Sequence, residues 1–289
     1  MPKDEHVREP LLRSFADIKP EPISWLWEPY VPRRRITILE GDAGVGKTFL
    51  ACKLAAMVSA GERWPWSASS ARPRRGAAII MSREDGLADT LRPRLELCGA
   101  DLKRVHTLTE WKNTAQEGAI TLKDIDVLER AFKAVKPALV VIDPLQAFIG
   151  ADVHMGSANK TRPVLAALGA LAERHDTAVV IVRHLTKGRT AKATYRGLGG
   201  VDFSAAVRSL LLAGKNPKTG EHAVVHLKSS AGPLGPSLGY RIDASGLAWT
   251  GVSNATAAQL LASDTASDDG DEARPRERAM EFLRDVLSD

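Results

Sequence analysis

The sequence has little cysteine and no long apolar run. Two cysteines, Cys52 and Cys98, occur in 289 residues, which gives neither a disulfide framework nor the spacing of a cysteine metal site. No apolar segment approaches the ~20 residues that a membrane-spanning helix requires. The first ten residues, MPKDEHVREP, are charged and lack the apolar stretch of a secretory signal. These absences exclude a disulfide-rich secreted protein and predict a cytoplasmic chain with reduced thiols and no membrane partner.

Aromatic residues are also few, and neither sign of charge dominates. Aromatic residues make up 5% of the chain and the net charge is +5, so composition alone is weak evidence for a nucleic-acid partner. Acidic residues concentrate in 264–272, which leaves the rest of the chain more basic. Two close tryptophan pairs, Trp25 with Trp27 and Trp64 with Trp66, predict packing of a segment against the core or against a neighbouring subunit.

Apolar strand-like runs alternate with helical patterns over much of the chain. Strands are expected at 36–39, 77–81, 105–108, 138–142 and 178–182, and helices at 47–60, 86–98, 123–136 and 160–175. This alternation predicts an α/β fold with a mostly parallel central sheet flanked by helices. Shorter runs at 207–213, 223–227 and 238–242, separated by turns, predict antiparallel hairpins added at one edge of the sheet.

The chain divides by composition into four parts. We expect an N-terminal arm over residues 1–20, a folded core over 21–252, and an acidic flexible linker over 253–275. Residues 276–289 have helical periodicity but nothing to bury against, which is typical of the first helix of a further module.

A phosphate-binding loop follows the first core strand. The segment LEGDAGVGKTFL contains the complete P-loop pattern between an expected strand and an expected helix, the context that the motif requires. Backbone N–H groups of such a loop surround phosphates at a helix N-terminus. We expect Lys47 to reach the β- and γ-phosphates of ATP and the Thr48 hydroxyl to bind Mg²⁺. The expected nucleotide-binding residues are Gly41, Asp42, Ala43, Gly44, Val45, Gly46, Lys47, Thr48 and Phe49.

A single carboxylate ends the expected strand at 138–142. Asp143 follows the apolar run and is itself followed by Pro144. A carboxylate at the tip of a buried strand beside a P-loop is typical of the second protein ligand of Mg²⁺. Proline cannot act as a general base, so we expect the residue that activates the attacking water to follow another strand. The strand ending at residue 81 leads to two acids, Glu84 and Asp85, and both are candidates for the general base.

The separate placing of Glu84 and Asp143 resembles the RecA/DnaB class of P-loop ATPases. AAA+ proteins differ, since they usually carry an Asp-Glu pair on one strand. Within the RecA/DnaB class, residues 21–245 resemble the RepA-like hexameric replicative helicases. The segments that carry the resemblance are PISWLWEPYVP, SREDGLADTLRPRL, LVVIDPLQAF, VVIVRHLTKG and YRGLGGVDFSAAVRSLLL. The resemblance implies that Glu84 activates water and that His184 senses the γ-phosphate.

The same resemblance assigns three further residues. Arg94 would lie against the adenine ring, with Arg92 as its competitor. Arg208 would reach the γ-phosphate bound by the neighbouring subunit, and Lys228 would assist from the same edge. DnaB-type members carry an arginine two residues after that lysine, whereas this chain has Ser230. The departure favours Arg208 as the residue that acts in trans and leaves Lys228 as the alternative.

A basic segment follows His184. RHLTKGRTAKATYRG carries Arg183 and then Lys187, Arg189, Lys192 and Arg196 among small and polar residues. In a RecA-like ring such a loop faces the central axis, where it would bind single-stranded DNA through its backbone. A solvated surface loop is the alternative.

The resemblance thus implies an ATP- and Mg²⁺-dependent DNA helicase, ring-forming and hexameric, acting in replication or mobile-element maintenance. An ATP-gated assembly factor without unwinding activity and a RecA-like recombination mediator remain alternatives, because a fold does not fix a function.

Overall fold

A nine-stranded sheet forms the centre of the molecule. The computed structural model describes residues 11–67, 73–150, 158–185 and 207–262. The strand order is β13-β12-β11-β10-β3-β9-β8-β4-β5, and the strands from β10 to β5 run parallel while β11 to β13 are antiparallel. The strands are β3 (Ile36–Gly41), β4 (Ala77–Ser82), β5 (Val105–Thr107), β8 (Pro137–Asp143), β9 (Ala178–His184), β10 (Ser209–Lys215), β11 (His222–Ser229), β12 (Ser237–Asp243) and β13 (Gly246–Ser253).

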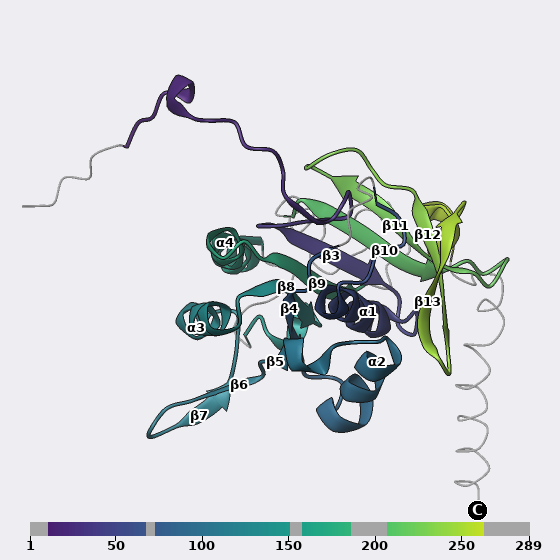
Figure 1. Cartoon of the computed structure of the whole chain (residues 1–289), viewed down its shortest axis with the longest axis horizontal. Helices are drawn as coiled ribbons and strands as arrows, with labels where there is room; N and C mark the ends of the chain where they lie inside the picture. The colour runs from purple at the N-terminus through teal and green to yellow at the C-terminus, as the bar shows by residue number, and fades with distance from the viewer. Residues whose placement is uncertain (1–10, 68–72, 151–157, 186–206, 263–289) are drawn as a thin grey trace, which may run out of the picture.

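Helices cover both faces of the parallel part of the sheet (Figure 1). They are α1 (Lys47–Ala60), α2 (Arg92–Leu97) with the π-helical turn η2 (Leu87–Leu91) before it, α3 (Ile125–Val135) and α4 (Ala158–Arg174). Alternate residues of each buried strand face opposite sides, as the pleat requires. Leu39 and Val141 pack in the cluster with α1, whereas Ile38 and Val140 pack in the cluster with α3 and α4. Both faces are therefore buried, which explains the continuous apolar runs.

The predicted fold class is confirmed. Each of the five core strands and four helices expected from the sequence is present, with ends shifted by a few residues. The three shorter runs form β10, β11 and β12, and β10 joins the parallel part beside β3. Strand β13 was not expected, because GLAWTGVS has small residues and little alternation. Its register comes from pairing with β12, a long-range contact that periodicity does not reveal.

The chain stays folded a little beyond residue 252. Helix α6 (Ala257–Leu261) lies within the range expected to be a linker. Thr256 and Gln259 form a capping box, which satisfies the free backbone N–H groups of its first turn. Leu260 and Leu261 pack on Leu212 and Ala223. Two buried leucines are thus enough to hold this short helix against the sheet. Residues 263–289 lie outside the described residues.

Short elements complete the fold. They are η1 (Phe15–Asp17), β1 (Trp25–Trp27), β2 (Val31–Pro32), η3 (Leu102–Arg104), β6 (Glu110–Lys112), β7 (Glu117–Ala119) and η4 (Leu145–Ala147). No helix within the described ranges is long and apolar enough to cross a bilayer.

The tryptophan pairs hold the entry segment to the core. Trp27 is buried and stacks on Trp64, with ring centroids 5.2 Å apart. Its indole Nε1–H donates to the Trp66 carbonyl at 2.8 Å. Packing within the subunit, one of the two expectations, is therefore what joins β1 to the segment after α1. Before β1, residues 11–24 form an exposed arm that projects from the body (Figure 1).

A buried histidine of β11 predicts a pH-dependent stability. The Gly235 N–H donates to His226 Nδ1 at 3.1 Å, and His226 Nε2 lies 3.1 Å from the Ser209 hydroxyl. Burial lowers the pKa of His226 to about 4. Between pH 6.5 and about 4 the unfolded chain therefore binds the proton more readily, so this residue's stabilising contribution is lost as pH falls.

We expect the stability advantage of the wild-type protein over His226→Gln to shrink by on the order of 2 kcal/mol between pH 7 and pH 4.5, because a pKa difference of one is worth ~1.4 kcal/mol. Urea unfolding followed by tryptophan fluorescence measures the advantage at each pH. An advantage that is the same at both pH values contradicts the buried neutral histidine.

Candidate nucleotide-binding site

The predicted site residues meet at the carboxyl ends of four neighbouring strands. In the register of the parallel strands, Gly41 of β3 lies beside His184 of β9, and Asp143 of β8 lies beside Ser82 of β4. The backbone N–H of Leu185 also donates to the Gly41 carbonyl at 3.4 Å. The P-loop, the Asp143 carboxylate and the Glu84 segment therefore open at one edge of the sheet, where ligands of open α/β sheets bind.

The P-loop has the backbone conformation that phosphate binding requires. Gly44 and Gly46 have φ of 79° and 84°, a region that residues with a Cβ rarely adopt. Helix α1 begins directly after Gly46, so its free N–H groups point into the loop. Lys47 is buried and donates from Nζ to the Asp42 carbonyl at 2.7 Å. Burial lowers the pKa of Lys47, while Asp143, Asp42 and Glu84 act in the opposite direction.

The edge hairpins support the P-loop, a feature that the sequence did not reveal. The Tyr240 hydroxyl donates to the Val45 carbonyl at 2.6 Å. A Cβ built on Gly46 would lie 2.2 Å from Ile242 Cδ1, and one on Gly41 would lie 2.2 Å from the Ala213 carbonyl oxygen. These contacts join residues that are far apart in the sequence, 195 positions for Tyr240 and Val45, so no local pattern could have identified them.

Gly46→Ala should weaken nucleotide binding. The new methyl group meets Ile242, and the residue must hold a positive φ. We expect at least a tenfold weaker affinity for a fluorescent ATP analogue in a titration. Gly99→Ala is the matched control, because Gly99 also has a positive φ but no atom lies near its Cβ position. Equal affinities of wild type and Gly46→Ala would show that the loop does not bind phosphates in this conformation.

Asp143 and Thr48 form an oxygen pair suited to a hard cation. Asp143 is buried, and burial raises the pKa of its carboxyl group, whereas the hydrogen bond from the Thr48 hydroxyl lowers it. The buried Oδ2 atom of Asp143 has no hydrogen-bond partner. A buried carboxylate oxygen that lacks a donor fits a metal ion or its water. Within the described ranges, no group of three or more His, Cys, Asp or Glu could hold a metal alone, so phosphate oxygens would complete the coordination.

Glu84 is the acid that remains available for water. Its Oε2 lies 3.7 Å from His184 Nε2, and both side chains are partly exposed. Asp85, the alternative candidate, is in an ion pair with Arg94 at 2.9 Å. A carboxylate oxygen that already accepts from a guanidinium is less available to accept from a water molecule. The geometry thus favours Glu84 over Asp85, and it brings Glu84 and His184 together across the intervening β8 strand.

Of the two candidate arginines in RPRL, the structure brings Arg94 to the P-loop helix. The Arg94 guanidinium carbon lies 5.2 Å from the centroid of the Phe49 ring, within the range of a cation–π contact. Arg92 instead forms an exposed ion pair with Glu96 at 3.1 Å. Phe49, Arg94 and Asp85 therefore make one connected group beside the loop, and its contact with adenine stays a prediction.

The interpretation of Arg183 as part of the basic loop is wrong. Arg183 is a fully buried strand residue that pairs with Glu40, which is equally buried. These two residues are neighbours in the register of β3 and β9 and precede Gly41 and His184 directly. Burial raises the pKa of Glu40, while Arg183 acts in the opposite direction. Residues Lys187, Arg189, Lys192 and Arg196 lie outside the described residues.

Arg208 and Lys228 lie at the opposite edge of the sheet from the P-loop of their own chain. The Arg208 backbone N–H donates to the carbonyl of Ile36, the first residue of β3. The Lys228 Nζ donates to the Val207 carbonyl at 3.3 Å, and burial, followed by the nearby Arg208, lowers the pKa of Lys228. Neither side chain can reach its own subunit's phosphates, so any role in hydrolysis must be played in a neighbouring subunit.

A sequence-family model described as an AAA domain matches residues 2–190, more than half of the chain. The protein therefore belongs to this family of P-loop ATPases, and its mostly parallel sheet with flanking helices is consistent with a RecA-like fold. The sequence is 28% identical over 154 residues to "DNA repair protein RadA" from two strains of Mycobacterium tuberculosis, which covers 53% of this chain and 27% of the relative. The chain thus spans about a quarter of the length of these curated relatives.

A solved structure shares the fold. The KaiC-like protein PH0186 from Pyrococcus horikoshii OT3 superposes with a TM-score of 0.54 at 13% identity, covering 78% of this chain and 95% of that one. At this identity the likeness concerns the fold alone. Together the family match and the fold confirm the coarser part of the resemblance, a RecA-like P-loop ATPase, and leave the RepA-like helicase branch as a prediction.

Proposed function

We propose that this protein is a Mg²⁺-dependent ATPase of the RepA-like branch that assembles as a hexameric ring and moves along single-stranded DNA. The observation that carries the proposal is that the candidate metal-binding carboxylate and the candidate general base follow different strands. Asp143 and His184 end the adjacent strands β8 and β9, and Glu84 follows the end of the neighbouring strand β4 by two residues. Arg94 is held by Asp85 at 2.9 Å, and the Arg208 backbone lies beside Ile36 at the opposite edge of the sheet.

The residues have separate tasks in this mechanism. Lys47 and the amides of residues 43–48 hold the phosphates, and Thr48 and Asp143 hold Mg²⁺. Mg²⁺ bound by these residues would neutralise charge that develops on the phosphates during transfer. Glu84 orients and polarises the attacking water and accepts its proton. His184, 3.7 Å from Glu84, donates a hydrogen bond to the γ-phosphate while that group is present. Loss of the phosphate then removes that hydrogen bond from His184.

The trans position of Arg208 supports assembly in a head-to-tail ring. A surface that carries Arg208 at one edge of the sheet and the P-loop at the other is not self-complementary, and repeated heterologous contacts of this kind close into rings or continue as filaments. In such an assembly Arg208 completes the phosphate site of the next subunit. The basic residues that follow His184 would then line a central channel suited to a phosphate backbone.

The test is ATP turnover with and without single-stranded DNA, combined with unwinding of a forked duplex. We expect several-fold stimulation by a long oligonucleotide, weaker at higher salt. Replacing Lys187 and Arg189 with alanine should remove the stimulation but leave the DNA-free rate unchanged. If DNA does not change the rate of ATP turnover and the forked duplex is not unwound, the proposed motor activity is contradicted. That result would favour an ATP-gated assembly factor.

A recombination mediator is the second candidate, favoured by the similarity to a protein named "DNA repair protein RadA". Negative-stain imaging with ATP and single-stranded DNA separates the two. Closed rings agree with the helicase-like motor, whereas continuous filaments on the DNA favour the mediator.

A further inference from the structure

The turn that carries Glu84 lies beyond the end of the β4–β8 ladder. The pairing of the two strands ends at Ser82 and Asp143, so the residues that follow Ser82 must be fixed by other contacts. Glu84 itself is exposed. A general base acts only when it is held close to its working position relative to the reacting atoms. The contacts that hold this turn relative to Asp143 therefore bear on the chemistry.

Arg83 provides such a contact. Its side chain reaches from the end of β4 to the segment that follows β8. Nη1 donates to the Ala147 carbonyl at 2.8 Å, and Nη2 donates to the Ile120 carbonyl. The guanidinium carbon lies 4.7 Å from the centroid of the Phe148 ring, within the range of a cation–π contact. Arg83 thus joins the residue before Glu84 to the short helix η4, which begins two residues after the end of β8.

The groups that Arg83 contacts are themselves fixed in place. The Leu122 N–H donates to the Phe148 carbonyl at 2.7 Å, which ties the segment after β7 to η4. The Ala147 N–H donates to the Pro144 carbonyl at 3.2 Å, and Phe148 is completely buried. The two acceptor carbonyls are therefore held relative to each other. The planar fork of a guanidinium can bind both at once, whereas an ammonium group is a single point charge.

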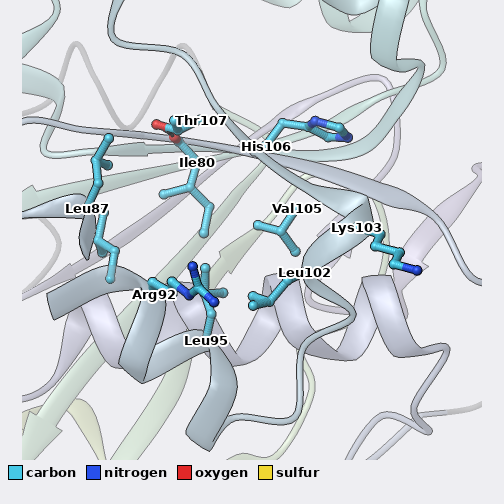
Figure 2. A pocket seen from close by; sticks show the side chains of 10 residues that line it. Ile80, Leu87, Arg92, Leu95, Leu102, Lys103, Val105, His106 and Thr107 are labelled. Carbon is cyan, nitrogen blue, oxygen red and sulfur yellow. Dashed lines mark hydrogen bonds between the residues drawn. The ribbon is translucent and has the colours of Figure 1, made fainter. Parts of the chain in front are cut away.

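Helix α2 holds the opposite side of the same turn. Asp85 forms its ion pair with Arg94 of α2 at 2.9 Å. Helix α2 is itself joined to β4 through the buried cluster that includes Ile80 and Leu95, and Figure 2 shows Ile80 pointing from β4 toward Leu95. The residues on both sides of Glu84 are thus engaged with the rest of the protein. Glu84 between them keeps its carboxylate exposed, as an acid that meets a water molecule must.

We propose that Arg83 is a positioning residue for ATP hydrolysis, which fixes the Glu84 carboxylate relative to Asp143 and therefore relative to the attacking water. The inference rests on the proposed ATPase mechanism and deepens it. The alternative is an arginine that only stabilises the surface, and such a residue would affect unfolding more than turnover. Because a displacement of about 1 Å can cost on the order of 10²-fold in rate, loss of the Arg83 contacts should lower kcat and spare nucleotide affinity.

Arg83→Met tests the contacts, since methionine keeps much of the apolar stem but has no donor. We expect kcat to fall by about 10²-fold, while the affinity for a fluorescent ATP analogue changes by less than about threefold. Arg83→Lys keeps the charge but cannot span both carbonyls, so it should recover only part of the lost rate. Arg130→Met is the matched control, because Arg130 is an exposed arginine of α3 that pairs with Asp126 at 2.9 Å. It should retain wild-type turnover, and urea unfolding checks that each variant is folded.

A double-mutant cycle shows whether Arg83 acts through Glu84. In the Glu84→Gln chain the proton acceptor is already missing, so adding Arg83→Met should lower kcat by less than about threefold more. A residue that supports the fold in general would lower kcat by the same factor in both chains. Three results would overturn the inference: fully additive losses, a kcat of Arg83→Met close to that of the wild type, or a loss of nucleotide affinity that accounts for the loss of turnover.

The same measurements separate this inference from the proposed function. If Glu84→Gln loses turnover and Arg83→Met does not, the proposed base stands and the positioning role is wrong. If Glu84→Gln keeps wild-type turnover, the proposed base is wrong and the role of Arg83 is contradicted with it. If the losses are coupled but single-stranded DNA does not stimulate turnover, the positioning role stands and the proposed motor is contradicted.

Discussion

Glu84→Gln should lower ATP turnover by a factor of roughly 10²–10⁴, the usual cost of a lost general base. Glutamine keeps the size of the side chain but cannot accept the proton of the attacking water. The Glu84 side chain is mostly exposed, and its Oε2 lies 3.7 Å from His184 Nε2, so the substitution should not disturb the fold. Steady-state phosphate release measures the rate, and nucleotide affinity should change by less than about threefold.

Asp85→Asn is the matched control for this substitution. Asp85 neighbours Glu84 but is paired with Arg94 at 2.9 Å. Its loss should weaken nucleotide affinity through Arg94 and leave the turnover at saturating ATP within about tenfold. A Glu84→Gln chain that retains turnover within about threefold of wild type, or an Asp85→Asn chain that loses more than Glu84→Gln, would reassign the base.

Arg208→Ala should lower turnover by about 10³-fold or more, the effect typical of an arginine that acts on the neighbour's phosphates. The side chain sits at the amino edge of the sheet, so the substitution leaves the chain's own P-loop untouched and nucleotide affinity nearly unchanged. Turnover should return when Arg208→Ala is mixed with the inactive Lys47→Ala chain. In mixed assemblies, the intact Arg208 of one chain meets the intact P-loop of the other.

The complementation separates action in trans from a loss of folding. Arg241→Ala provides a control, because Arg241 is an exposed arginine on β12 that pairs with Asp243 at 2.9 Å. It should retain wild-type turnover. If the mixture of Arg208→Ala and Lys47→Ala stays inactive while Lys228→Ala mixed with Lys47→Ala recovers, Lys228 is the residue that acts in trans.

The parts of the site that could be predicted are those with short-range signals. The P-loop is continuous in sequence, and Asp143 and Glu84 each follow an apolar strand, so their meeting at one sheet edge follows from parallel pairing. The register of β4, β8, β9 and β3 agrees with that expectation. Helix α1 was predicted to the residue, because a P-loop fixes its start and Gly61, with a positive φ, ends it.

The parts that could not be predicted depend on contacts between distant segments. The Glu40–Arg183 pair joins residues of two strands, 143 positions apart. In the sequence, Arg183 precedes a run of basic residues, which is why it was predicted to belong to the basic loop. A buried pair of this kind contributes little net stability but is costly to break, since one charge is then left unpaired. Tyr240 behind Val45 is equally non-local. The choice of Asp85 as the partner of Arg94 depends on a helix position that sequence spacing leaves open.

ATP turnover per chain, measured across protein concentration together with the mass of the assembly, tests the account most directly. A site completed by a neighbour predicts that specific activity rises steeply over the concentration range in which the protein assembles and is negligible for the monomer. A monomer that hydrolyses ATP at the full rate, with no dependence on concentration, would contradict the claim that Arg208 completes the site of an adjacent subunit.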